Sequence, residues 1–499
     1  MRCKKQLLIY ILFLGLFACE IRGEELPENA ILARIGDHLI TVQDFIRRAE
    51  YTIRPDYCRG DLYVHKKIIL NSLIAEKLLA LEEAQNSQLD SIEGFQAFLL
   101  GRKEQAMRQW YYYDQAYNKV QLDIDQLKKA YKLAGRTIDV AFYTLPNPRI
   151  ADKVVQALED GLFFEEIYEA FSGIDSLPRQ QVGWFDREDP IIHDLLFNDN
   201  LTPNQVLGPV KTGDGSFLLM KVMGWIDRPV ITEREANQRW KDVDERLTDS
   251  EAKTIYKELV GEIMRGKRVD FNEDIFFTYA DHVADYYLKS LEEKENQLKM
   301  MMWEDQEIQE LAPTTPFPDA LKHTPFFRVN EQTWTVEDFE KTLQTHPLVF
   351  RKQKISHQEF PEQFKLAIVD LIQDRFVTEE CFKLGYETVT AVRLNEEMWA
   401  DYYYARQRRN DFLRSKGVYG DFGKDYLHLI ETVLNPYLDS LQNLYSDQIE
   451  INMSEFEKIE LTSIDMFVTQ KNVPYPVIVP QFPILTTDNR LDYGREMDD

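Results

Sequence analysis

Residues 35–45 of the chain read IGDHLITVQDF, and residues 329–339 read VNEQTWTVEDF. Each stretch has the pattern of a short extended arm that turns and then begins a helix. In both, a threonine is well placed to be the N-cap, and an aspartate three residues later can complete a capping box. These capping pairs are Thr41 with Asp44 and Thr335 with Asp338. The sequence therefore predicts the same strand–turn–helix segment twice.

The sequence that follows each stretch is duplicated as well. An apolar stripe at helical spacing comes first, and a run of three tyrosines follows it, at 111–113 and at 402–404. The stripes consist of Leu70, Leu73, Ile74, Leu78 and Leu81 in the first copy and Phe364, Ile368, Leu371, Ile372 and Phe376 in the second. The interval between the copies is far too long for a solenoid. We therefore expect two related helical modules, 31–135 and 326–411, that flank a different domain.

Between the two modules the pattern changes to short β-branched and aromatic runs. The first of these, DVAFYTL at 139–145, stops at Pro146 and predicts a strand. Helical patterns and three further strand-like runs follow over residues 149–222. The order strand, helices, strand, helix, strand, strand predicts a small sheet with helices packed on it. The expected fold class is α+β, predominantly helical, with the small domain at 136–228.

Short motifs carry a resemblance to known families. VGWF at 182–185, an apolar helix that ends at Phe197, and LGPV at 207–210 resemble a parvulin-type peptidyl-prolyl isomerase domain. GDHLITVQDF at 36–45 and LIAEKLL at 73–79 are similar to the N-terminal region of SurA- and PrsA-type extracytoplasmic foldases. The resemblance implies helical chaperone modules that flank a small parvulin-like β-α-β domain, with other proteins as substrates.

The chain departs from this family where the family's chemistry lies. Parvulins carry one histidine in the first strand of their sheet and another in the last strand. The only histidine between Thr137 and Arg228 is His193, in a predicted helix where we expect a solvated or half-buried position. We therefore predict no catalytic residue and an impaired isomerase. An active peptidyl-prolyl cis-trans isomerase stays the alternative, because the reaction needs an apolar slot that favours the twisted amide more than a strong acid or base.

Apolar residues in the second strand-like run and the following helix are the candidates for substrate binding. They are suited to line a proline-sized pocket; the alternative is that they form the helix face that covers the small sheet. Trp184 and Phe185 alternate along a strand, so at least one of them should face the core. The full set of candidates is Trp184, Phe185, Ile191, Ile192, Leu195 and Phe197.

The N-terminus has the features of an export signal. Residues 2–5 include three basic side chains, and the apolar run 7–18 suits a signal peptide, whereas a membrane span needs about 20 residues. The run leads into LFAC, which resembles a bacterial lipobox and implies lipidation of Cys19. We expect a signal peptide at 1–18, a lipidated tether at 19–30, and a periplasmic protein anchored to the cell envelope at the outer membrane. Ordinary cleavage beside an incidental cysteine is the alternative.

The composition excludes several classes of partner. The 499 residues include 59 Lys plus Arg and 85 Asp plus Glu, which gives a net charge of -26. Nucleic acids and anionic membrane surfaces repel such a chain. The sequence has no motif for a dinucleotide, a nucleotide phosphate or a zinc site, so we expect no cofactor, no metal and no small-molecule substrate. Cys58 and Cys381 are expected to be free buried thiols.

The remaining segments are expected to be mostly helical. Residues 229–311 have the pattern of a helical connector with long helices at 233–271 and 281–310, and residues 412–499 that of a C-terminal helical region with an extended tail. The functional hypothesis is a membrane-anchored extracytoplasmic chaperone that binds unfolded or nascent envelope proteins. A working isomerase and a structural lipoprotein that scaffolds an envelope complex are the alternatives.

Overall fold

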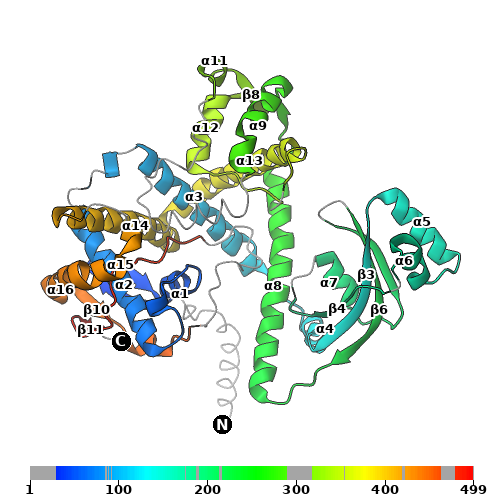
Figure 1. The fold of residues 1–499 in the computed structure, drawn as a ribbon, viewed down its shortest axis with the longest axis horizontal. Coiled ribbons are helices and arrows are strands. Elements are labelled where there is room, and N and C mark those ends of the chain that lie inside the picture. Colours follow the sequence, from blue (N-terminus) through cyan, green and yellow to red (C-terminus); the bar gives the residue numbers. More distant parts are fainter. Residues whose placement is uncertain are drawn as a thin grey trace, which may run out of the picture. The chain divides into compact units, whose positions relative to one another are not determined.

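The computed structural model of the chain forms two compact units (Figure 1). The first unit consists of Met1–Tyr113 together with Glu258–Asp499, and the second consists of Asp114–Lys257. Both units combine small sheets with helices, and helices predominate. The expected α+β class is therefore confirmed.

The structure describes most of the chain between residues 30 and 497. The expected signal peptide, Cys19, the tether up to residue 29 and connector residues 289–311 lie outside the described residues. Within the described part, no helix combines the length and the apolar character needed to cross a membrane. The residues between 30 and 497 that are not described are 85–86, 88, 92, 175, 187–189, 213–215, 289–316, 353–354, 419–421 and 462–477.

Both copies of the duplicated sequence fold in the same order. Each copy begins with a two-stranded hairpin, continues into a short helix and ends with two long helices. The first copy consists of β1 (Ile31–Ile35), β2 (His38–Thr41), α1 (Val42–Glu50), α2 (Tyr63–Ala84) and α3 (Glu93–Gln115). The second copy, preceded by α11 (Asp319–Lys322), consists of β8 (Pro325–Val329), β9 (Gln332–Thr335), α12 (Val336–Thr345), α13 (Phe360–Lys383) and α14 (Thr390–Ser415).

The predicted start of each copy is confirmed in detail. The turn of each hairpin contains one residue with a positive φ, Gly36 at 57° and Asn330 at 53°, and these two residue types adopt that conformation most readily. The amide of Asp44 donates to the hydroxyl of Thr41 at 3.0 Å, and the Asp44 carboxylate accepts from the Thr41 amide at 3.2 Å. The second copy has the same capping box.

A strand from elsewhere in the chain completes the hairpin of each copy. In the first copy, β10 (Ile449–Ile451) pairs with β1 and is itself covered by β11 (Arg495–Glu496). In the second copy, β7 (Val269–Phe271) pairs with β8. The sheet orders are β11-β10-β1-β2 and β7-β8-β9. The C-terminal region thus completes the first copy, and the connector completes the second.

The strands β10 and β7 occupy equivalent places in the two copies. Directly after β10, the amide of Asn452 donates to the carbonyl of Leu32 at 2.9 Å. Directly after β7, the amide of Asn272 donates to the carbonyl of Phe326 at 2.9 Å. Leu32 and Phe326 are the second residues of β1 and β8, so the duplication extends beyond the segments that the sequence identified.

The connector differs from the expectation. The helix predicted over 233–271 is α8 (Glu233–Ile263), which ends early because the chain turns at Gly266 (φ 75°) and then forms β7. The next helix, α9 (Glu273–Tyr287), begins before the predicted residue 281 and packs its aromatic side chains into the core of the second copy. The two helix boundaries were wrong because a strand of three residues leaves no periodic signal.

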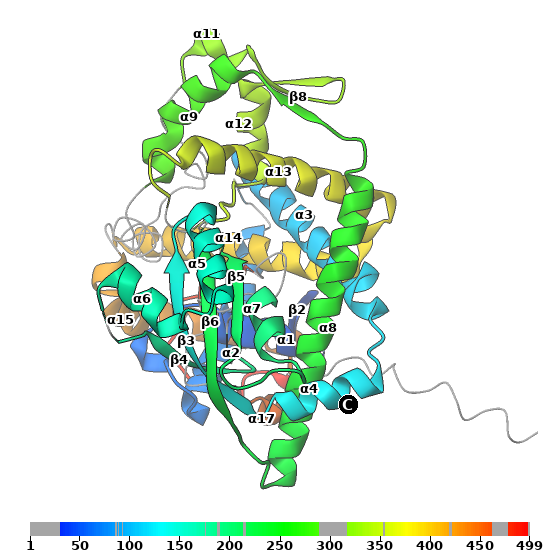
Figure 2. The same ribbon diagram turned by 90° about the vertical axis from the view of Figure 1, so that its right-hand side faces the viewer.

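Each copy packs its last helix against the other copy. Helix α14 lies along α2, and α3 reaches α13 (Figure 2). There, Arg108 Nη1 donates to Thr378 Oγ1 at 2.7 Å. Beside this bond, Cys381 Sγ donates to the carbonyl of Met107 at 3.5 Å. Cys381 and Cys58 are buried, as predicted, and neither forms a disulfide among the described residues. This exchange of helices joins the two copies into one unit.

Two buried charged side chains of α2, Glu76 and Lys77, are paired with opposite charges. Arg48 on α1 donates to both carboxylate oxygens of Glu76, at 2.9 and 2.7 Å. Lys77 contacts the carboxylate of Asp401 on α14 at 2.6 Å, and His38 lies 3.0 Å from the same carboxylate. Burial acts to raise the pKa of Asp401, but Lys77 and His38 outweigh it and hold this pKa below its usual value. The carboxylate therefore stays charged at neutral pH.

The C-terminal region packs into the core of the first copy. Its extended tail buries Phe482, Ile484 and Leu485 there. Arg48 fixes the tail by donating to the carbonyl of Gln481 at 2.7 Å. The helical elements of this region are α15 (Tyr426–Leu429), a π-helical turn (Ile430–Leu434), α16 (Asn435–Leu444) and α17 (Met453–Lys458).

The second unit contains the small sheet predicted between the two copies. Its strands have the order β4-β3-β6-β5, and all neighbours are antiparallel. Helices α5 and α6 cover one face of the sheet, and α7 lies on the other face (Figure 1). The elements are β3 (Arg136–Leu145), α5 (Pro148–Glu159), α6 (Phe164–Ser172), β4 (Arg179–Gly183), α7 (Pro190–Leu196), β5 (Val206–Lys211) and β6 (Phe217–Asp227).

This compact unit is wider than the domain expected at 136–228. Helix α4 (Ile124–Leu133), which the sequence placed in the module 31–135, contributes Leu133 to the core beside α7. Helix α8 contributes Val243 to the same core. The sheet face that carries α7 is therefore covered by helices from both flanks of the predicted domain.

Replacing Asp401 with alanine should lower the free energy of unfolding of the first unit by roughly 3–5 kcal/mol, because Lys77 is left buried without its carboxylate. Urea denaturation at pH 7 measures the change. The control is Glu379→Ala, which removes an exposed partner 3.5 Å from Arg375 and should cost less than about 1 kcal/mol. Equal effects of the two substitutions would contradict the importance of the buried pair.

Candidate functional site

The six candidate binding residues surround the end of β4 and α7, but they do not face one pocket. Trp184, Ile192 and Phe197 are buried in the core between the sheet and α4. Trp184 is 4% exposed and Phe185 is 39% exposed, which confirms that one of these neighbours faces the core. The predicted strand position was wrong, because β4 ends at Gly183 and both residues lie in the turn that follows it. The three candidates that are half-buried or exposed are Leu195, Phe185 and Ile191.

Three rings form a cluster at the centre of this region. The Trp184 ring lies edge-on against His193 and Phe197, with centroid distances of 4.6 and 5.3 Å, and the last two rings are 4.7 Å apart. His193 and Phe197 are four residues apart at the end of α7 and therefore share one helix face. A turn after β4 positions Trp184, because the amide of Gly183 donates to the Asp186 carboxylate at 2.7 Å.

An arginine from α8 holds the ring cluster from outside the predicted domain. Arg246 Nη1 donates to the carbonyl of Trp184 at 2.5 Å, and its guanidinium lies 5.9 Å from the centroid of the Trp184 ring. The sequence interpretation did not include this residue. The sequence does contain a feature that could have pointed to it. Val243 and Leu247 are four residues apart, which indicates an apolar face of α8 beside Arg246.

His193 is a neutral, buried member of the ring cluster. It is 8% exposed, more buried than the solvated or half-buried position expected from the sequence. Burial, and to a lesser extent the positive charge of Arg246, together lower the pKa of His193 to about 4. Among the described residues, neither His193 Nε2 nor Trp184 Nε1 has a hydrogen-bond partner.

The chemistry of this cluster favours packing over acid–base catalysis. An efficient general acid or base has a pKa near the working pH, whereas the pKa of His193 lies far below 7. The described part of the chain contains no group of three or more His, Cys, Asp or Glu side chains that could hold a metal ion. The cluster can support apolar contacts through the more exposed neighbours Phe185 and Ile191.

A second set of apolar side chains is exposed on the helical layer that packs against the other face of the sheet, opposite α7. They lie in or directly beside α6, a helix of nine residues. Phe163, directly before the helix, is 66% exposed, and Phe171, one residue before its end, is 49% exposed. The sequence reading treated 163–171 only as a helical pattern and missed its exposure. The full set is Leu162, Phe163, Phe171 and Ile174.

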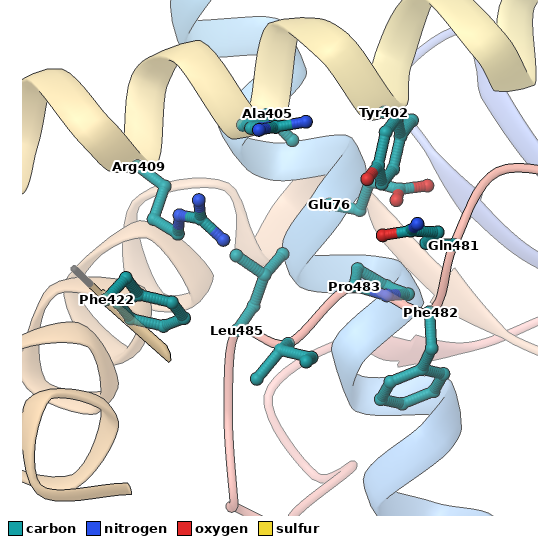
Figure 3. Close-up of a pocket in the computed structure, with 11 residues that line it drawn as sticks. Glu76, Tyr402, Ala405, Arg409, Phe422, Gln481, Phe482, Pro483 and Leu485 are labelled. Carbon is teal, nitrogen blue, oxygen red and sulfur yellow. The ribbon is translucent and has the colours of Figure 1, made fainter. Parts of the chain in front are cut away.

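The first unit has a small hollow that opens to solvent. It lies where the C-terminal tail passes α2 and α14 (Figure 3). Glu76 in its wall is already paired with Arg48, and Arg409 lies 4.4 Å from the centroid of the Phe422 ring. These charged groups are engaged by the protein itself, and the tail forms one wall. The hollow is a place where the module holds an extended stretch of polypeptide.

The solved structures that are similar to this chain include distant matches to two isomerase-type proteins. No known sequence family and no curated protein matches the chain. A PrsA peptidyl-prolyl isomerase from Bacillus cereus is similar with 12% identity and a TM-score of 0.20, over 46% of this chain and 92% of that chain. PrsA from Bacillus subtilis is similar with 14% identity and a TM-score of 0.16, over 46% of this chain and 93% of that chain. Both similarities are low, so the function has to be inferred from this chain's own residues.

Trp184→Ala should destabilise the second unit by roughly 3–5 kcal/mol, because it removes a large ring from the core. Phe185→Ala is the matched control and should cost about 1 kcal/mol or less, because that ring is largely outside the core. Urea denaturation followed by circular dichroism measures both. A larger loss for the Phe185 variant would show that Phe185, and not Trp184, is the ring of this turn that the core depends on.

Acidification should weaken the second unit through His193. The pKa of His193 is about 4 in the folded chain and about 6.5 in an unfolded one, so the unfolded state binds the extra proton between these values. Stability should therefore fall as the pH drops from about 6.5 to 4, and His193→Met should reduce that fall. Histidine NMR titration measures the pKa directly. A His193 that titrates near 6.5 would contradict the buried, neutral assignment.

Proposed function

We propose that the chain is an extracytoplasmic chaperone that binds unfolded or nascent envelope proteins, with a parvulin-like unit impaired in catalysis. The observation that carries the proposal is the exposure of large apolar side chains in and beside α6. Unfolded polypeptides expose apolar segments of varied sequence, and aromatic side chains contact such segments with little loss of conformational entropy. The ring cluster behind α7 supports the loss of catalysis, because its one histidine is buried and neutral.

The charge of the chain fits this role. A net charge of -26 keeps a protein soluble and apart from other copies of itself, which matters for one that exposes apolar side chains and holds aggregation-prone partners. The same charge disfavours nucleic acid as a partner. The proposed partners are therefore polypeptides that present apolar segments.

The proposed location is the periplasmic side of the outer membrane. A signal peptide at 1–18, lipidation of Cys19 and a tether at 19–30 would hold the two units near the site where envelope proteins arrive. The mass of the mature N-terminal residue tests the anchor, and an unmodified residue at another position would exclude it. A structural lipoprotein that scaffolds an envelope complex shares the anchor but would not suppress client aggregation.

Phe163→Ser combined with Phe171→Ser should reduce the suppression of aggregation of an unfolded outer-membrane β-barrel protein at least several-fold. The expected cause is the loss of two exposed rings that contact the client. Light scattering during dilution of the client from urea, with the mature chain present, measures the effect. Circular dichroism should show an unchanged fold, because both side chains lie largely outside the core.

The control is Phe277→Ser combined with Phe382→Ser, which changes two rings of similar exposure (56% and 41%) in the first unit. This variant should keep the activity of the unsubstituted chain. Failure of that unsubstituted chain to suppress aggregation would exclude the chaperone. A rate of proline-limited refolding raised to the level of an intact parvulin would replace impaired catalysis with the active-isomerase alternative.

A further inference from the structure

The two copies of the module differ at the outer edge of their sheets. In the first copy, β10 is covered by β11, which runs parallel to it with Arg495 opposite Glu450. In the second copy, β7 stands in the place of β10. Within the described residues, no strand pairs with the outer edge of β7. The first copy therefore shows that the outer edge of such a sheet can take up a further strand. In the part of the chain that the structure describes, the edge of the second copy has none.

The match between β7 and β10 is close at the level of single hydrogen bonds. The amide of Gly36 donates to the carbonyl of Gln448 at 2.9 Å, and the amide of Asn330 donates to the carbonyl of Arg268 at 3.0 Å. Gln448 and Arg268 directly precede β10 and β7, and Gly36 and Asn330 are the two turn residues with positive φ. Both strands therefore enter the sheet in the same register.

The backbone of β7 presents hydrogen-bonding groups to its open edge. The carbonyl of Arg268 and the amide of Asn272 bond to the β8 side of the sheet. Because hydrogen-bonded and non-bonded pairs alternate in an antiparallel ladder, the amides and carbonyls of Val269 and Phe271 point the other way. In the first copy the matching carbonyl, that of Ile451, accepts from the amide of Met497 at 3.1 Å.

The charged side chains beside β10 and β7 differ, and the difference indicates which charge a strand added to β7 should carry. In the first copy, Glu450 lies 3.5 Å from Arg34 and 3.8 Å from Arg495 of the added strand. In the second copy, the matching carboxylate of Asp270 lies 3.6 Å from Arg328 and 2.7 Å from Arg268. Arg268 thus supplies to Asp270 the second cation that Arg495 of the added strand supplies to Glu450. Two arginines around one aspartate leave the open edge positive.

A further cation lies beside β7 on the other face of the strand, because Phe271 and Asp270 alternate along it. Lys365 on α13 lies with its Nζ 5.0 Å from the centroid of the Phe271 ring. The chain as a whole carries a net charge of -26, so a positive edge is a local exception. An incoming strand with an acidic side chain in the position of Arg495 would be attracted, whereas one with an arginine there would be repelled.

We propose that the outer edge of β7 binds an extended segment of another polypeptide as an added parallel strand, with an acidic residue opposite Asp270. Main-chain hydrogen bonds supply affinity in such strand addition, and the side chains supply the preference. The inference rests on the proposed function in one respect, that the occupant is a client polypeptide. It adds a defined site and a charge preference to the loose apolar contacts at α6.

The test uses two fluorescein-labelled peptides and the full mature chain. One peptide has the sequence of residues 490–497, RLDYGREM, and the other carries Arg495→Glu. The substituted peptide should bind several-fold tighter by fluorescence anisotropy at low salt, and Arg268→Glu in the protein should reverse this order. Tighter binding of the unsubstituted peptide would assign the edge to the chain's own C-terminal tail and overturn the proposal.

Backbone pairing is tested separately. Val269→Pro removes an amide that points to the open edge and makes no bond to β8, so the fold should stay intact while peptide binding falls at least ten-fold. Val269→Thr keeps the amide and should bind normally. N-methylation of the Met497 amide in the Arg495→Glu peptide should also weaken binding at least ten-fold. This test uses the unsubstituted protein, so it does not depend on the folding of the proline variant. Binding that survives the N-methylation would overturn the proposal.

The two proposals can fail independently. If the mature chain binds the peptide with these preferences but does not suppress aggregation, the edge is a strand-binding site and the chaperone function is excluded. If aggregation is suppressed and neither peptide binds, the chaperone stands and the β7 edge is not its client site.

Discussion

Burial of charge along helix α2 is the constraint on which the first unit depends. A charge in the core is costly unless a partner compensates it, and here the partners come from far along the chain. Lys77 pairs with Asp401 across 324 residues, and Arg48 reaches the carbonyl of Gln481 across 433 residues. The first copy therefore cannot supply all the partners of its own buried charged groups. It is complete only when the second copy and the C-terminal tail are both in place.

Local signals in the sequence were enough to predict the repeated part of this fold. The capping box at Thr41 and its duplicate at Thr335 are local hydrogen-bond patterns within four residues, and local chemistry specifies them completely. The strands β7 and β10 were missed because three residues carry no usable periodicity. Their position depends on pairing with hairpins that are far away in the sequence, and no local rule contains that information.

The same limit explains the candidate site. Alternation along a strand predicts that one of Trp184 and Phe185 is buried, but only the cover of the sheet decides which one. That cover includes Arg246, on a helix that the sequence placed in a connector. The buried state of His193 likewise depends on its neighbours in space. Residue types and spacing were enough to locate the candidate site around β4 and α7. The packing of α8 determines which side chains of that site remain at the surface.

The duplication connects the way this protein is held together with the way it can bind others. Each module needs a third strand that its own hairpin does not supply, and the first module takes a fourth from the C-terminal tail. A module that closes its own sheet with extended polypeptide already has the backbone geometry to accept extended polypeptide from elsewhere. What distinguishes the second copy is charge: Arg268 replaces the arginine that β11 brings to the first copy. On the proposed strand addition, the internal tail matches the edge of β10 and is mismatched to the edge of β7, which leaves the β7 edge to a different polypeptide.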